Sequence, residues 1–479
     1  MVSKIGRLGA IALAFVASIE SVSAQSILRD QEIEQFIDDY AFPIFRAAGL
    51  PAEDINIIIV GDQTPNAFAG GLNMGIHTGL LSAADTPNQV EGVIAHEAGH
   101  IAGGHTARSD DALSAASRPI LLSLVLAAGA VAAGSPQAGI GLLGLGQNIG
   151  VANLLKYSRG QESSADQAAI TYLDEVGHSS KGLIEFFGKL RNYQVVTGRR
   201  VNPYLQSHPL ANARITALTR RAEASPYIDE KDSPEEIYRL EMIKAKIAGF
   251  LQLSHFTIRQ YPLSDQSDPA LYARAVAYYR ASDIDNAQKE INTLLEKYPD
   301  NPYFHELKGQ MMFEFGRIDA SIEPHRRSVE LLPQSALFRI NLGRALLATE
   351  DPSKLEEATK EFRIALDFEN NNAFGWFELS RAYGYLGKEH YAHLANAEFH
   401  YHARDRNGAN RYARRALTGF EKNSAEWRQA MDIILTTQGD NGPAIPTTRE
   451  QSPTEQEEEQ RREPGEVPDP PAFSSTWKN

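Results

Sequence analysis

The 479-residue chain contains no cysteine. This absence excludes disulfide bonds and thiolate ligands, so any bound metal must be held by histidine, aspartate or glutamate. The chain also lacks an excess of basic residues, because 47 Lys and Arg stand against 61 Asp and Glu, for a formal net charge of −14. This acidic balance gives no reason to expect a nucleic-acid partner.

The N-terminus lacks an apolar run long enough for a membrane span, which needs about 20 residues. Two basic residues precede a short apolar run over residues 8–17, and small residues follow at 22–24. This order is typical of a secretory signal peptide, with a membrane anchor as the alternative. We predict cleavage after Ala24 and a mature protein in the bacterial periplasm or outside the cell, of which we favour the periplasm.

The length favours two to four domains. From composition and pattern we predict a signal peptide at 1–24 and a catalytic domain of strands and helices at 25–225. Connecting helices at 226–262, a helical repeat domain at 263–435 and an acidic tail at 436–479 follow. The tail is rich in Pro, Glu, Ser, Thr and Gln, so it cannot bury enough apolar surface to fold, and we predict disorder.

The predicted repeat domain has a period of 34 residues. Pro299 and Pro333 lie 34 apart (333−299), as do Gly309 and Gly343 (343−309). A helix–turn–helix unit of this length is the tetratricopeptide signature, with a non-repeating helical bundle as the alternative. Stacked units of this kind form an α-solenoid with a concave surface for partners.

A candidate metal-binding motif, HEAGH, lies at residues 96–100, within an apolar segment of helical character. His96 and His100 are four residues apart, so on a helix they lie nearly one above the other and can converge on one ion. Glu97 is rotated about a quarter turn from His96. There its carboxylate can take a proton from an attacking water and pass it to the leaving amine. This spacing is the HExxH signature of zinc peptidases, and two satisfied core histidines are the alternative.

A catalytic zinc usually has three protein ligands and one open position. The pattern HExxHxxGxxH would need histidine at 106, but that residue is threonine and His105 comes one position early. The other possibility is a glutamate on a later helix, and Glu162 lies 62 residues after His100 (162−100). Asp166 follows four residues later on the same helix face, where it can hydrogen-bond a ligand histidine.

HEAGH followed by ESSAD at 162–166 resembles the HExxH and ExxxD motifs of the gluzincin peptidases, which include the CAAX prenyl protease and HtpX-like enzymes. NAFAGG at 66–71, HTGLL at 77–81 and QSHPLANARI at 206–215 are similar to further segments of that family. About residues 30–435 resemble exported members that carry C-terminal repeats. The acidic tail is not part of this likeness.

The resemblance implies an α+β, mostly helical fold, with a zincin-type metallopeptidase domain that contains a small sheet. It implies one zinc ion (Zn2+) per chain, held by His96, His100 and Glu162. It also implies an edge strand around residues 66–69, to which a substrate peptide can add as an extra strand.

The same resemblance gives His208 a role at the zinc site, either as a donor to the oxyanion or as a ligand at the open position that keeps the enzyme latent. Arg214 and Arg159 are candidates to brace the carboxylates, with surface salt bridges as the alternative. Three other histidines are expected to be structural or exposed: His77, His105 and His178.

Residues 119–155 form a Gly/Ala/Leu-rich stretch that Gly134-Ser135-Pro136 interrupts. The first segment has only about 15 residues, short for a membrane span of about 20. We expect a helical hairpin that either covers the cleft or docks on a membrane surface. A hairpin that spans the membrane is the third alternative.

The sequence therefore predicts a periplasmic zinc endopeptidase joined to repeats that dock partners or clients. By resemblance, the clients are misassembled outer-membrane β-barrel proteins, and the partner is the barrel-assembly machinery. The alternative from another class is a chaperone or scaffold with a structural zinc and little proteolysis.

Overall fold

The computed structural model describes residues 27–106, 117–127, 136–197, 203–209 and 212–437. The predicted signal peptide and nearly all of the predicted tail lie outside these residues. Contacts divide the chain into two compact units, the first ending at Ile247 and the second starting at Ala248, with Asp30–Glu32 grouped with the second. The predicted domain limits at 225 and 262 stay predictions.

The first unit contains a small four-stranded sheet. Its strands are β1 (Ile27–Leu28), β2 (Asn56–Val60), β3 (Ala67–Gly70) and β4 (Asn73–His77), in the spatial order β1-β2-β4-β3. β2 pairs with β4 in parallel, whereas β1 and β3 pair with their neighbours antiparallel. The β-branched run in β2 suits a pleated, half-buried surface. β3 therefore forms one edge of the sheet, at the segment where the sequence predicts an edge strand.

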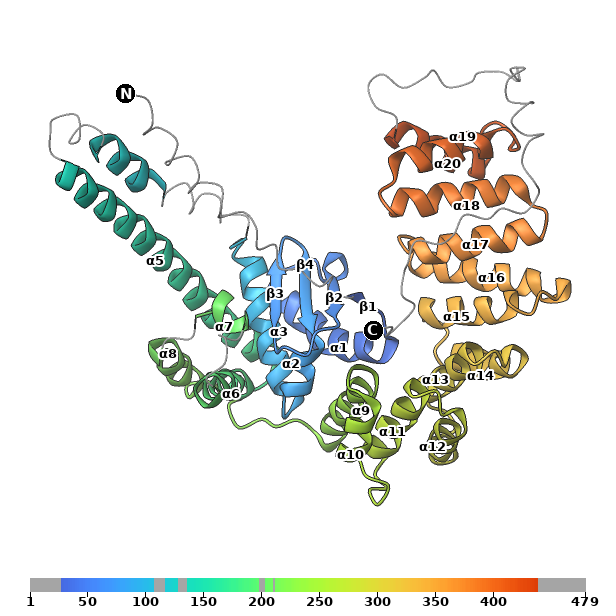
Figure 1. Ribbon diagram of the computed structural model, residues 1–479, viewed down its shortest axis with the longest axis horizontal. Coiled ribbons are helices and arrows are strands. Elements are labelled where there is room, and N and C mark those ends of the chain that lie inside the picture. Colours follow the sequence, from blue (N-terminus) through green and yellow to red (C-terminus); the bar gives the residue numbers. More distant parts are fainter. Residues whose placement is uncertain (1–26, 107–116, 128–135, 198–202, 210–211, 438–479) are drawn as a thin grey trace, which may run out of the picture. The chain divides into compact units, whose positions relative to one another are not determined.

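Besides the sheet, the first unit contains helices (Figure 1). They are α1 (Gln31–Ala47), the short η1 (Ala52–Asp54), α2 (Thr78–Ala83), α3 (Pro87–Ala102), α5 (Pro136–Val176), α6 (Lys181–Thr197), α7 (Pro203–Ser207), α8 (Asn212–Ala222) and α9 (Pro234–Leu251). α3 packs against both α5 and α6. A side chain on Gly99 would bring a Cβ to 2.9 Å from the backbone of Ala165, so glycine permits this close approach of α3 and α5.

The Gly/Ala/Leu-rich stretch 119–155 is described in part. Residues 117–127 are helical, and residues 136–155 belong to the 41-residue helix α5. Six large apolar side chains of the first helix are exposed, namely Ile120, Leu121, Leu122, Leu124, Val125 and Leu126. Among the described residues, no helix combines the length and apolar character that crossing a bilayer requires.

The second unit is a stack of helix pairs (Figure 1). Its helices are α10 (Ser254–Gln260), α11 (Asp268–Arg280), α12 (Ile284–Lys297), α13 (Pro302–Glu314), α14 (Ile318–Leu331), α15 (Ala336–Leu347), α16 (Pro352–Phe368), α17 (Ala373–Tyr385), α18 (Glu389–His402), α19 (Arg406–Leu417) and α20 (Ala425–Thr437). α11, α13 and α15 start 34 residues apart (302−268 and 336−302). The predicted mostly helical fold with a small sheet and helical repeats is confirmed.

The glycines that mark the period have the same packing role in successive repeats. A Cβ on Gly309 would lie 2.6 Å from the ring of His325, and a Cβ on Gly343 would lie 2.6 Å from the ring of Phe362. In each unit the first helix therefore leaves room for a ring from the second helix. This explains why a small residue recurs every 34 positions.

Candidate metal centre

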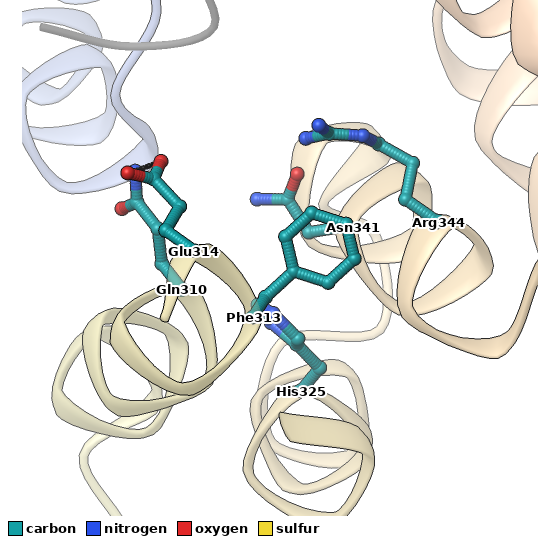
Figure 2. Close-up of a pocket in the computed structure, with 6 residues that line it drawn as sticks. All are labelled: Gln310, Phe313, Glu314, His325, Asn341 and Arg344. Atoms are coloured by element: carbon teal, nitrogen blue, oxygen red, sulfur yellow. Dashed lines mark hydrogen bonds between the residues drawn. The ribbon is translucent and has the colours of Figure 1, made fainter. Parts of the chain in front are cut away.

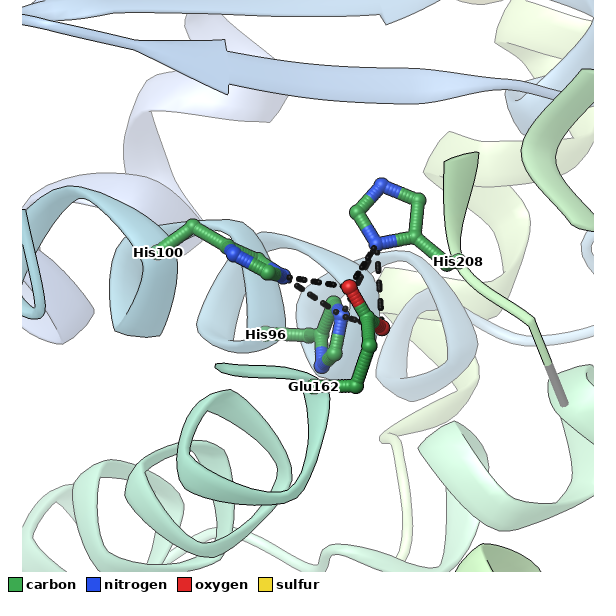
Figure 3. Close-up of side chains that lie close together, drawn as sticks. All are labelled: His96, His100, Glu162 and His208. Carbon is green, nitrogen blue, oxygen red and sulfur yellow. Dashed lines mark hydrogen bonds and ion pairs between the residues drawn. The ribbon is translucent and has the colours of Figure 1, made fainter. Parts of the chain in front are cut away.

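Four buried side chains converge in the first unit (Figure 3). His96 and His100 come from α3, Glu162 comes from α5, and His208 follows α7 directly. One nitrogen or oxygen atom from each lies within 4.8 Å of the others. Nε2 of His100 lies 3.1 Å from Nε2 of His96, and both lie 3.5 Å from the Glu162 carboxylate. Three residues predicted as ligands and one predicted as a possible ligand thus lie in one cluster.

His208 connects this cluster to the predicted general base. Its Nδ1 lies 3.1 and 3.2 Å from the two oxygens of Glu162, and its Nε2 lies 3.5 Å from Oε1 of Glu97. The ring is stacked on Tyr204, with 4.6 Å between ring centroids. The two nitrogens of one imidazole therefore face two different carboxylates.

Glu97 lies beside the cluster and is fully buried. Within the part of the chain that the structure describes, neither of its carboxylate oxygens accepts a hydrogen bond. Burial of a carboxylate that accepts no hydrogen bond lowers the stability of the folded state. Its oxygens are free to accept a proton, as the role of a general base requires.

Arg214 and Asp166 support the cluster from behind. The guanidinium donates from Nε and Nη2 to the two oxygens of Asp166, both at 2.7 Å, and its Nη1 lies 2.8 Å from Oε2 of Glu162. Oδ1 of Asp166 in turn lies 3.1 Å from Nδ1 of His96. The chain of contacts from Arg214 through Asp166 orients His96, whose Nε2 then faces the cluster.

The electrostatics of the cluster depend on this network. Burial works against ionisation of Glu162, but hydrogen bonds with His208 and His96 hold the pKa of this carboxyl below its usual range. Burial would lower the pKa of His96, but its contacts with Asp166 and Glu162 raise it to about 9. Burial and repulsion from His96 lower the pKa of His100 to about 3. The cluster thus combines an ionised carboxylate with at least one neutral imidazole.

This donor set fits a divalent transition metal. Two imidazole nitrogens with one carboxylate form one of the ligand sets of catalytic zinc sites, and buried neighbours hold these side chains in place. His96, His100 and Glu162 would be the ligands, and His208 has a nitrogen in the same cluster.

Four other candidate residues, one arginine and three histidines, are not part of the cluster of possible metal ligands. Arg159 is exposed on α5, one turn before Glu162. His77 is buried at the end of β4, and Nδ1 of His178 lies 2.6 Å from Oε1 of Glu91. His105 follows α3, and its Nδ1 lies 2.9 Å from Nδ1 of His100.

Sequence reasoning missed two contacts at the site, the His105–His100 pair and the stack of Tyr204 on His208. One local signal existed for the second contact, because Tyr204 lies four residues before His208. No local signal existed for the first, because a helix that ends at Ala102 does not predict where His105 points.

Comparison with known proteins agrees with this geometry. Residues 28–222 match peptidase family M48. The putative beta-barrel assembly-enhancing protease of Vibrio cholerae serotype O1 is 25% identical over 375 residues, which cover 76% of this chain and 75% of the relative. The beta-barrel assembly-enhancing protease of Escherichia coli K12 is 25% identical over 385 residues, which cover 78% of this chain and 76% of the relative.

A further relative matches a smaller part of the chain. The metalloprotease YcaL of Escherichia coli K12 is 31% identical over 166 residues, which cover 34% of this chain and 60% of the relative. The family match contains every residue of the buried cluster and the Arg214–Asp166 pair that supports it. We conclude that this chain is a metallopeptidase whose residues 28–222 are similar to peptidase family M48.

Proposed function

We propose that this chain is a zinc-dependent endopeptidase of the periplasm that degrades misassembled outer-membrane proteins. The observation that carries the proposal is the buried cluster of three imidazoles and one carboxylate, beside a second carboxylate that accepts no hydrogen bond from a described residue. The names of two relatives refer to β-barrel assembly. This supports outer-membrane β-barrel proteins as clients and the barrel-assembly machinery as partner.

Each residue of the site has a chemical role in this proposal. His96, His100 and Glu162 hold the zinc, which when bound supplies a Lewis acid that polarises the scissile carbonyl. Glu97 accepts a proton from the attacking water and delivers it to the leaving amine. Asp166 and Arg214 hold His96 and Glu162 in position during these transfers. Arg159 stays a candidate brace on the exposed side of α5.

His208 has two possible roles, and the contacts favour one. Its Nδ1 lies in the ligand cluster, 3.1 Å from Glu162, which supports a fourth ligand that keeps the enzyme latent. In that role His208→Ala raises basal proteolysis. If His208 instead donates to the oxyanion, the same variant lowers turnover by roughly 10²–10³-fold. Unchanged metal coordination and unchanged proteolysis would refute both roles.

The substrate strand would add to β3, the edge of the small sheet. Its neighbour β4 continues directly into α2, and α3 with the HEAGH residues packs against β3. An extended peptide hydrogen-bonded to β3 would therefore run close to the cluster. This arrangement supports cleavage of unfolded or unpaired segments, because only these have a free backbone.

The repeats would dock clients or partners. A small pocket lies among them (Figure 2). The pocket is lined by Gln310, Phe313, Glu314, His325, Asn341 and Arg344. The Arg344 guanidinium is held between two aromatic rings, 5.1 Å from the centroid of Phe313 and 5.2 Å from that of Phe374. An arginine ordered in this way loses little entropy when a partner's oxygen atoms bind it.

The exposed apolar side chains of residues 117–127 support either a lid or peripheral contact with a membrane. Leu122→Lys with Val125→Lys tests the second possibility by flotation with lipid vesicles. Loss of vesicle binding with unchanged cleavage of a soluble peptide supports membrane contact. Changed peptide cleavage with unchanged flotation supports the lid.

Metal analysis and proteolysis of the purified mature protein test the main proposal. The wild type should hold one zinc per chain, and Glu162→Gln should lose it. Glu97→Gln should keep the zinc and partner binding but lose cleavage. If cells that carry Glu97→Gln tolerate envelope stress as well as the wild type, the chaperone or scaffold alternative is correct. Cell fractionation tests the periplasmic location.

A further inference from the structure

The turn that follows α3 contacts three parts of the site. Nδ1 of His105 lies 2.9 Å from Nδ1 of the ligand His100. The carbonyl of His105 accepts a hydrogen bond at 3.1 Å from Nε2 of Gln161, the residue before Glu162. Oγ1 of Thr106 donates at 3.1 Å to the carbonyl of Ala69 in the edge strand β3. The backbone around His105 is thus anchored to α5 and to β3.

His100 presents its other nitrogen to the cluster. Its Nε2 lies 3.1 Å from Nε2 of His96 and 3.5 Å from Oε1 of Glu162. A neutral imidazole that binds a metal through Nε2 carries its proton on Nδ1. That N–H needs an acceptor, and the acceptor normally fixes both the tautomer and the ring orientation of a metal-binding histidine.

We propose that His105 is the positioning residue for His100. Its unprotonated Nδ1 accepts the Nδ1–H of His100 and thereby holds the tautomer that presents Nε2 to the metal. His105 then carries its own proton on Nε2. The proposal rests on the metal site of the proposed function, and it assigns a role to a residue outside the HExxH and ExxxD motifs.

The two ligand histidines of α3 therefore have different orienting partners. Nδ1 of His96 faces the Asp166 carboxylate at 3.1 Å, whereas Nδ1 of His100 faces the imidazole of His105. A carboxylate on His100 as well would add a further negative charge to a cluster that already holds Glu162 and Asp166. A neutral ring provides the acceptor without that charge.

Gly103 provides the space for this ring. A Cβ on Gly103 would lie 2.4 Å from Nε2 of His105. The φ of Gly103 is −70°, an ordinary helical value that any residue adopts, so room for the ring and not backbone freedom requires glycine here. Gly103→Ala should therefore displace His105 without touching His100.

Zinc affinity of the full chain, measured by competition with a chromophoric chelator, tests the proposal. His105→Leu fills similar space without an acceptor and should weaken zinc binding roughly 10–100-fold. His105→Asn places an amide oxygen near the position of Nδ1 and should restore binding to near the wild-type value. Gly103→Ala should weaken binding in the wild type but cause no further loss in a His105→Ala background.

A second readout does not depend on bound metal. Nitrogen NMR of the imidazoles in the metal-free protein should report the Nδ1–H tautomer for His100 in the wild type and in His105→Asn, and a shift toward Nε2–H in His105→Leu. Unchanged zinc affinity in His105→Leu overturns the proposal, as does equal weakening by His105→Asn, because only shape would then matter. If the wild type itself binds no zinc, the proposed function fails, while the His100 tautomer still tests the role of His105.

Discussion

Replacement of Arg214 by methionine should destabilise the metallopeptidase domain more than the loss of a surface ion pair does. The guanidinium makes three close contacts with two carboxylates, at 2.7 Å twice to Asp166 and at 2.8 Å to Glu162. All three side chains are at most 8% exposed. Methionine keeps an apolar stem of similar length, so the change removes the charge and its donors with little loss of packing.

The magnitude follows from burial. Removal of one partner from a buried ion pair costs about 3–5 kcal/mol, because the remaining charge is left uncompensated in a medium that solvates it poorly. The domain as a whole has on the order of 5–15 kcal/mol of stability. Arg214→Lys keeps the charge but not the two parallel hydrogen bonds to Asp166, so its loss should lie between wild type and Arg214→Met.

Arg46→Met is the matched control. Arg46 lies 3.1 Å from Glu53, but these side chains are 62% and 73% exposed, so solvent screens the pair and the loss should be much smaller than for Arg214→Met. Hydrogen exchange of α3 and α5 peptides, measured by mass spectrometry at increasing urea with chelator present, reports the free energy of opening in this unit alone. Equal losses for Arg214→Met and Arg46→Met would refute the reasoning.

Two further predictions concern buried packing. Burial lowers the pKa of His325 to about 3. Below the unfolded pKa of about 6.5 the unfolded chain binds a proton that the folded chain does not, so the free energy of unfolding decreases as the pH falls. At pH 5 this decrease should be about 2 kcal/mol. His325→Gln should abolish this decline, measured by urea denaturation followed by tryptophan fluorescence. Gly99→Ala should cost about 1–3 kcal/mol and weaken metal binding, because its Cβ would lie 2.9 Å from the Ala165 backbone. A Cβ on Gly160 would have nothing within 4 Å, so Gly160→Ala should instead raise helix stability by up to about 1 kcal/mol. If the two variants changed the free energy of unfolding in the same direction, this reasoning would be wrong.

The repeat architecture was predictable from local pattern. Helix starts 34 residues apart follow the sequence period, and the glycines at 309 and 343 occupy equivalent positions against rings. The strand order in the first unit could not be predicted in this way. Its four short strands lie in the order β1-β2-β4-β3, which depends on how strands distant in sequence pair. The sequence pattern by itself predicted only a mixture of strands and helices, and the family resemblance added the small sheet.

The two arginine candidates show the same limit at the site. Arg159 lies three residues before Glu162 on one helix, the closer candidate by sequence, yet its side chain is exposed. Arg214 lies 48 residues from Asp166 and makes the buried contacts. Sequence separation could not rank them, because the contact depends on where α8 packs against α5.

The sequence by itself determined that two imidazoles and an adjacent carboxylate lie on one helix face, because helical geometry is local and four residues complete about one turn. The need for a third ligand pointed to Glu162 on a later helix, and family resemblance added His208 as a candidate. Only the tertiary structure decided that His105 faces His100, that Tyr204 stacks on His208 and that Arg214 braces both carboxylates. These contacts depend on the close packing of helices and turns, which no periodicity in the chain encodes.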